Sequence, residues 1–146
     1  WPGRINIMSG RLPESPATNT SITVVGNLTY AAKDGSAVIG LIAQKDVLVA
    51  TYAPNTIEIN AAALAQKGNV WYPNSGGVKT NLQFYGSIST YDTWTWLWTN
   101  GGGNPISGYP TNTTTYDTNL LYGPPPCYPT TGNYSVLNWR EQLYNP

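Results

Sequence analysis

The chain has 146 residues, a net charge of zero and no histidine, and only 10% of its residues are charged. This length suits one domain with a sizeable core. The charged fraction is low, since a typical domain has about a quarter of its residues charged. Seven basic residues balanced by seven acidic ones do not favour nucleic acid, whose binding rests on phosphate neutralisation. Without histidine, Ser-His-Asp and Cys-His nucleophile systems and histidine-based metal sites are excluded, and we expect no cofactor.

The low charge also indicates where the protein works. The surface must be covered by uncharged polar residues, which is typical of an extracellular or cell-surface protein. No apolar run approaches the ~18 residues of a membrane-spanning helix. The first residues, Trp1-Pro2-Gly3-Arg4, have neither an initiator Met nor a signal-peptide pattern. We therefore expect a fragment or processed form of an exported protein, whose upstream segment could hold an export signal or an anchor.

The first half of the chain predicts a series of strands. Residues 1–21 are weakly patterned, although residues 4–8 alternate and predict an edge or capping strand. Residues 22–30 alternate more clearly and predict the first convincing strand. The dipeptide Asp34-Gly35 marks a turn. Residues 38–50 are nearly continuously apolar, as in strands that are buried on both faces.

Residues 61–66 are the ambiguous part of the pattern. Their alanines have high helix propensity, and Gly68 could end a helix. A helix of two turns would be marginal without packing, however. The parallel with residues 42–46 favours a strand instead, in which small alanine side chains suit a narrow interior.

A repeated motif runs through residues 22–89. Its turn residues align in one column: Gly26, Asp46, Gly68 and Gly86. Ala43-Gln44-Lys45 also recurs as Ala65-Gln66-Lys67. Successive turn residues are about 20 positions apart, and such a period with short β-rich units is typical of a solenoid. We therefore predict an all-β fold, a short right-handed β-solenoid of about four coils, with Gly26 and Gly86 stacked above one another.

We predict that residues 1–146 form one domain with three segments. Residues 1–21 form an N-terminal edge or cap, residues 22–89 form the coils, and residues 90–146 form loops and a cap rich in Trp, Thr and Pro. Residues 136–143 would be a short strand or helical turn that caps an open end.

The proline-rich segment at residues 122–129 must be extended or polyproline-like, because successive prolines lack amide donors. We expect it to lie along the outside of the coils. It contains the only cysteine, Cys127, which excludes an internal disulfide. We expect this side chain to be buried, as free cysteines usually are.

Several motifs occur in an order that resembles a known group of proteins. They are Gly-Asn-Leu-Thr-Tyr at 26–30, Gly-Leu-Ile-Ala-Gln at 40–44, Tyr-Gly-Ser-Ile at 85–88, Pro-Pro-Pro-Cys-Tyr-Pro at 124–129 and Trp-Arg-Glu at 139–141. As a set they resemble the C-terminal region of bacterial cell-envelope proteins grouped with PilX-like type IV pilus components, over about residues 20–142. The resemblance implies an exported β-solenoid-like domain displayed on or with pili, with no catalytic residues to carry over. The pilin-type hydrophobic N-terminal helix is absent from this sequence.

Three tryptophans are the best candidates for a ligand-binding or interface site. Trp94, Trp96 and Trp98 alternate with other residues, and on a strand all three indoles would point to one face, near Tyr91. Three exposed indoles would form a large apolar patch. They could pack within the protein, form a protein interface or stack on sugar rings, and the sequence leaves these alternatives open.

Two aspartates share a local sequence. Asp92 and Asp117 each lie in Thr-Tyr-Asp-Thr. Two carboxylates that faced each other across a cleft would suit glycoside cleavage, and they could also bind calcium. Turn aspartates that cap backbone amides are the simpler interpretation, and we predict no metal site.

These patterns favour a non-enzymatic extracellular domain with a structural or adhesive role. Its expected partners are copies of itself or pilus and envelope proteins, with glycans as a further candidate and no nucleic acid. Uncapped solenoid ends stack readily, so self-assembly into a filament is one form of this hypothesis. The alternatives are a carbohydrate-binding module that uses the tryptophans, and a glycoside-cleaving enzyme around Asp92 and Asp117.

Overall fold

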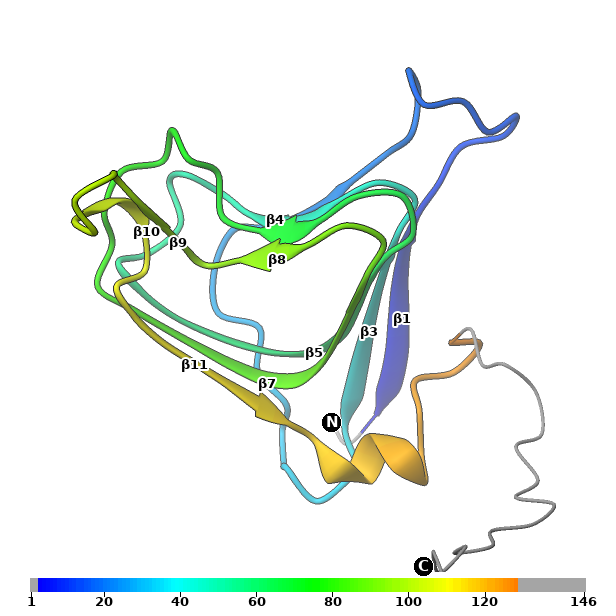
Figure 1. Ribbon diagram of the computed structural model, residues 1–146. Coiled ribbons are helices and arrows are strands. Elements are labelled where there is room, and N and C mark those ends of the chain that lie inside the picture. The colour runs from blue at the N-terminus through cyan, green and yellow to red at the C-terminus, as the bar shows by residue number, and fades with distance from the viewer. Residues whose placement is uncertain (1–2, 129–146) are drawn as a thin grey trace, which may run out of the picture.

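The computed structural model describes residues 3–128 and shows an all-β protein, as predicted (Figure 1). Its elements in chain order are β1 (Arg4–Ser9), β2 (Ile22–Val24), β3 (Val38–Ala43), β4 (Val47–Val49), β5 (Thr56–Ala65), β6 (Val70–Trp71), β7 (Asn81–Thr90), β8 (Trp94–Thr95), β9 (Leu97–Thr99), β10 (Pro105–Gly108), β11 (Thr111–Tyr116) and the 3-10 helix η1 (Thr118–Leu121). Within the described part, no helix is both long enough and apolar enough to cross a membrane.

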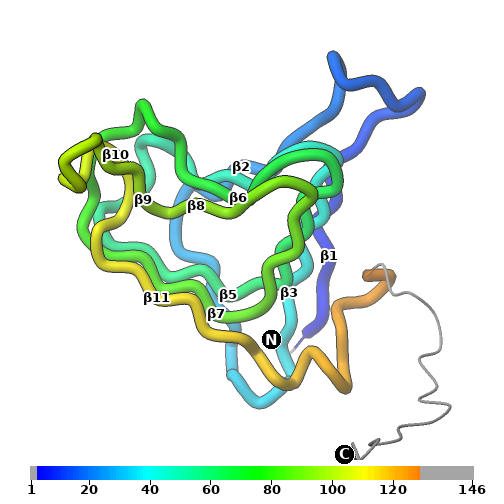
Figure 2. Tube along the Cα trace, in the orientation of Figure 1, coloured from blue at the N-terminus to red at the C-terminus, as the bar shows by residue number. Residues whose placement is uncertain are grey.

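Two parallel sheets enclose the interior. One has the order β1-β3-β5-β7-β11 and the other β2-β4-β6-β8, so the chain alternates between them from β1 to β8. Figure 2 shows β5, β7 and β11 together on one side of the outline, with β2, β6 and β8 on the opposite side. The antiparallel pair β9 and β10 lies between β8 and β11 in the sequence. Strands from before residue 22 and after residue 89 join the same two sheets as the strands between them.

Strand partners recur at a longer interval than the sequence motif suggests. In the larger sheet, Gly40 of β3 pairs with Ala62 of β5, which pairs in turn with Ser87 of β7. Partners in the smaller sheet follow one another at a similar spacing, from β2 through β8. Partners in the central strands thus recur at roughly 24 positions rather than about 20. The predicted interval was too short because turn residues that occupy different places in the fold were aligned with one another.

The predicted glycine column is therefore wrong at its ends. Gly86 lies inside β7, opposite Ala61, whereas Gly26 lies in a bend after β2. Gly86 has a φ of 147°, and a Cβ atom there would collide with the carbonyl group of Ala61, so this glycine serves close strand approach rather than a turn. The middle of the column is correct in part, since the carboxylate of Asp46 lies against Gly68.

The strand interpretation of the alanine-rich segment is confirmed. β5 continues to Ala65, and Ala43 of β3 lies opposite Ala65, which places the two Ala-Gln-Lys repeats side by side. The side chain of Ala63 faces the interior, while that of Ala62 packs outside the sheet with Val38 and Leu120. Strand partners on both sides and cover on both faces override the helix propensity of this segment.

The main core lies between the sheets. Its largest members include Leu41, Ile57, Leu82 and Phe84, together with the fully buried Tyr72 and Tyr109. A smaller cluster on the outer face of the larger sheet combines Val38, Ala62 and Leu120 with Tyr128. The segment that follows β11 therefore crosses the outside of the sheet, where the proline-rich segment was predicted to lie. Residues 136–143, predicted to cap an open end, lie outside the described residues.

Candidate functional site

The three candidate tryptophans occupy different environments. Trp96 is 3% exposed and stacks on Phe84, with ring centroids 5.8 Å apart and an interplanar angle of 29°. Its Nε1 donates a hydrogen bond to Oγ1 of Thr114, 3.2 Å away. Trp94 is 47% exposed, and its ring centroid lies 6.3 Å from that of Trp96. Trp96 therefore belongs to the core, and Trp94 extends the aromatic cluster to the surface.

Trp98 is held by a separate set of contacts. Its Nε1 donates a hydrogen bond to the carbonyl oxygen of Tyr72 at 2.7 Å, and its ring meets Trp71 edge to face at 6.3 Å. A bend at Trp96 divides β8 from β9. This bend interrupts the strand alternation from which one shared face for the three indoles was predicted. The indoles of Trp96 and Trp98 are used within the protein, so Trp94 alone offers a large exposed part of its ring.

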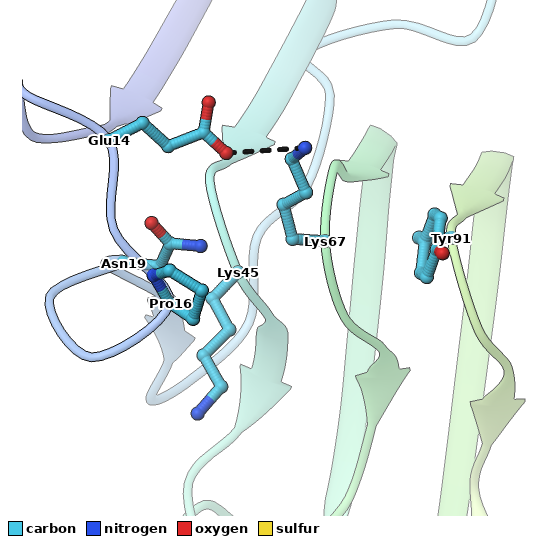
Figure 3. Close-up of a pocket in the computed structure, with 6 residues that line it drawn as sticks. All are labelled: Glu14, Pro16, Asn19, Lys45, Lys67 and Tyr91. Carbon is cyan, nitrogen blue, oxygen red and sulfur yellow. Dashed lines mark ion pairs between the residues drawn. The ribbon is translucent and has the colours of Figure 1, made fainter.

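Tyr91 lies in the turn between β7 and β8 and is 76% exposed. It lines a shallow pocket of about 330 Å³, together with Lys45, Lys67 and residues of the loop after β1 (Figure 3). Glu14 in that loop forms an ion pair with Lys67 at 3.2 Å, and both side chains are about half exposed. Exposed ion pairs contribute little to stability, so the pocket is a solvated corner of mixed charge.

The two candidate aspartates are not equivalent. Asp117 is 1% exposed and caps η1, accepting hydrogen bonds from the backbone N–H of Asn119 and the hydroxyl of Tyr85, each at 3.0 Å. Burial raises the pKa of Tyr85, and the bond to Asp117 raises it further. Asp92 is exposed in the turn that follows the end of β7. Asp117 follows β11, which ends opposite Gly86, well before the end of β7, so the two aspartates lie at different points along β7. The capping interpretation therefore fits Asp117.

The described part of the chain also bears on metal binding and on the cysteine. Residues 3–128 contain no group of three or more Asp, Glu or Cys side chains that could hold a metal ion. Cys127 was predicted to be buried, and this is wrong: it is exposed, with a φ of 54°. The turn in which Tyr128 donates its N–H to the carbonyl of Pro125 directs Tyr128 rather than Cys127 toward the outer cluster. Burial raises the pKa of Tyr128 to about 12.

The N-terminal end of the two sheets is an open apolar surface. β1 and β2 are edge strands, with no strand on their outer side among the described residues. Ile7 of β1 is 41% exposed, although it points to the same side of the sheet as buried Leu41, its partner in β3. A groove of about 330 Å³ lies at this end, and its lining includes the large apolar residues Ile7, Ile22, Leu28 and Leu41.

The C-terminal end is open in the same way. β8 and β11 are edge strands, and β11 covers only the first part of β7, from Asn81 to Gly86, so residues 87–90 of β7 also form an edge. Half-exposed Trp94 and Tyr116 lie on these strands. The alternating pattern of residues 4–8 predicted an edge strand at the first end, whereas the second end was not predicted as a site.

Comparisons with protein-family models, with curated proteins and with solved structures find no match to this chain.

Proposed function

We propose that the protein is a non-enzymatic structural or adhesive domain of the bacterial cell surface that assembles with copies of itself or with pilus and envelope proteins. The observation that carries the proposal is the pair of open ends. Within residues 3–128, both sheets finish in unpaired strands at each end, and these strands leave isoleucine, tryptophan and tyrosine side chains partly exposed. An unprotected strand edge is a template for pairing with another chain.

A right-handed β-solenoid of about four coils is the architecture that we propose for this role. Its support is the parallel pairing of all neighbours within the two sheets and the nearly regular spacing between partners in the central strands. Along a line through Ile7, Leu41, Ala63 and Ile88, four strands lie side by side. In repeat folds of this kind, each unit contacts only its neighbours, and terminal units need a polar cap to prevent stacking.

The exposed surface supports a location outside the cell. Only 10% of residues are charged, and the edge strand β11, of sequence TNTTTY, is exposed throughout and carries no charge. Charged residues, particularly lysine, are a common device that protects edge strands from association. Their absence from β11 fits an edge that is used in assembly, as does the resemblance to pilus-associated envelope proteins.

Sedimentation velocity and electron microscopy of the full chain over a range of concentrations test the proposal. We expect a concentration-dependent series of species that grow in length, with rods on the grid. A single monomeric species at every concentration, with no rods, would overturn self-assembly as the function.

A further inference from the structure

We infer that copies stack head to tail in register, with the β7 and β8 edges of one copy pairing with β1 and β2 of the next. This inference rests on the proposed self-assembly and specifies its geometry. A column is defined here as the series of residues that lie side by side across one sheet. In both sheets, the side chains at the first and last positions of a column complement each other across the proposed contact between two copies.

The first matching column lies in the larger sheet. It runs Ile7, Leu41, Ala63, Ile88, one residue from each of β1, β3, β5 and β7. Leu41 and Ala63 are buried, whereas Ile7 and Ile88, at the two ends, are only partly buried. Continuing the column into a second copy places the next Ile7 against Ile88. Each end thereby supplies the apolar neighbour that the other end lacks.

The second matching column lies in the smaller sheet. It runs Ile22, Val47, Val70, Trp94, from β2 through β8. Val47 and Val70 are buried, while Trp94 is 47% exposed and Ile22 borders the apolar groove. In the continued column, Trp94 meets the next copy at Ile22, so its exposed indole is covered by the groove. Large aromatic side chains that fill apolar pockets are the usual anchors of protein interfaces.

The same register brings opposite charges together. One column consists of Ser9, Ala43, Ala65 and Thr90. In the stack, the residues that follow Ser9 of the next copy therefore lie over those that follow Thr90. Arg11 is held at the position of Gln44, whose side chain bonds both the N–H and the carbonyl of Arg11 at 3.0 Å.

One step along the stack, Arg11 of the next copy therefore lies beside Tyr91 and Asp92. Arg11 and Asp92 are exposed, and neither forms an ion pair within residues 3–128. Charge complementarity of this kind fixes the register of a contact. The surfaces at the two ends differ, so the contact is heterologous and generates an open filament rather than a closed dimer.

The stack has a defined repeat. The column through Leu28, Ile59, Phe84 and Thr114 crosses four backbone segments, as does each of the columns above. Neighbouring strands lie about 4.8 Å apart, so each copy advances the filament by roughly 19 Å.

Reversal of the two charges tests the inference. Asp92→Arg and Arg11→Asp should each weaken association by about tenfold, and the double variant should recover most of the wild-type association. Asp34→Arg is the matched control, because it changes the net charge by as much as Asp92→Arg at an exposed turn residue outside the four strands of the proposed contact, β1, β2, β7 and β8. It should leave association unchanged. Circular dichroism checks that each variant is folded.

The outcomes separate this inference from the proposed function. If the wild-type chain stays monomeric, self-assembly itself fails. If rods form but single charge reversals leave them unchanged, or if the double variant recovers nothing, the register is wrong and self-assembly survives. A chain cut after residue 128 provides a second check. If rods appear only after this cut, self-assembly and the inference both fail for the full chain.

Discussion

The middle strands and the two ends of the sheets use similar side chains in different ways. In the middle, β3 and β5 have strand partners on both sides and cover on both faces, and most of their residues are buried. At the ends, β1 and β8 continue the same columns, but Ile7 and Trp94 remain almost half exposed. The middle therefore provides most of the folding free energy, whereas the ends leave apolar surface exposed, which the proposed assembly would cover. Substitutions should separate stability from assembly along this division.

The largest expected loss of stability comes from closing the tightest strand approach. Gly86→Leu adds a Cβ atom that collides with the backbone of Ala61, at a φ of 147° that L residues rarely adopt. Backbone strain and overpacking together should lower the free energy of unfolding by about 4–5 kcal/mol. Urea denaturation measures the change.

The control for this substitution is Gly101→Ala, because no atom lies within 4 Å of a Cβ atom placed there. Its effect should stay within about 0.5 kcal/mol. A Gly86 variant as stable as the wild type would contradict the close packing of β5 against β7.

Two tryptophans test the division directly. Trp96→Ala removes a 3% exposed indole that stacks on Phe84 and should cost about 3–4 kcal/mol of stability. Trp94→Ala removes a half-exposed indole and should cost less than about 1 kcal/mol, while weakening association. Thermal unfolding and sedimentation velocity report the two quantities. Equal losses of stability with unchanged association would remove the distinction between middle and end.

A smaller effect is expected at the end of β11. Asp117→Ala removes the cap of η1 and leaves the Tyr85 hydroxyl without its acceptor, which should cost about 2 kcal/mol. Asp92→Ala should change stability by less than about 0.5 kcal/mol, since its side chain is exposed. Urea denaturation of both variants compares them. Equal effects would contradict the capping role of Asp117.

The smallest effect concerns an ion pair on the outer face of the larger sheet. Lys33 and Glu58 are 2.9 Å apart, with side chains 48% and 36% exposed. The hydrogen bond from Lys33 lowers the pKa of Glu58. The pair therefore stabilises the fold above the unfolded pKa of about 4.3, and this contribution is lost as the pH falls through the lower folded pKa.

Lys33→Ala should accordingly cost less than about 0.5 kcal/mol at neutral pH and nothing once Glu58 is protonated. Urea denaturation at neutral and acidic pH checks both values. A cost that persists at acidic pH would assign the effect to Lys33 packing over the Tyr85 ring, 4.8 Å from its centroid.

Periodic parts of the sequence predicted the middle of the fold. The all-β class and the strand over the alanine-rich segment followed from alternation and from the Ala-Gln-Lys repeat, whose alanines lie opposite each other across β3 and β5. The repeat worked because stacked strands place equivalent residues in equivalent surroundings. The glycines at the two ends of the predicted column failed as markers, because Gly26 lies in a bend and Gly86 lies within a strand.

The ends and the later segment were harder to predict because their structure depends on contacts that alternation does not encode. A bend at Trp96 separated the tryptophans, and a turn placed Cys127 outward while Tyr128 packed on the sheet. The open ends are a property of the assembled sheets. In these sheets, Ile88 and Trp94 end the columns that Ile7 and Ile22 begin, and this relation depends on how the strands pair.

Electron cryo-microscopy of assemblies formed by the full chain is the most direct test of stacking through the open ends. Head-to-tail stacking predicts unbranched filaments in which strands repeat every ~4.8 Å along the axis and one copy is added every ~19 Å. Closed two-fold dimers, or a population of monomers alone at every concentration, would contradict it.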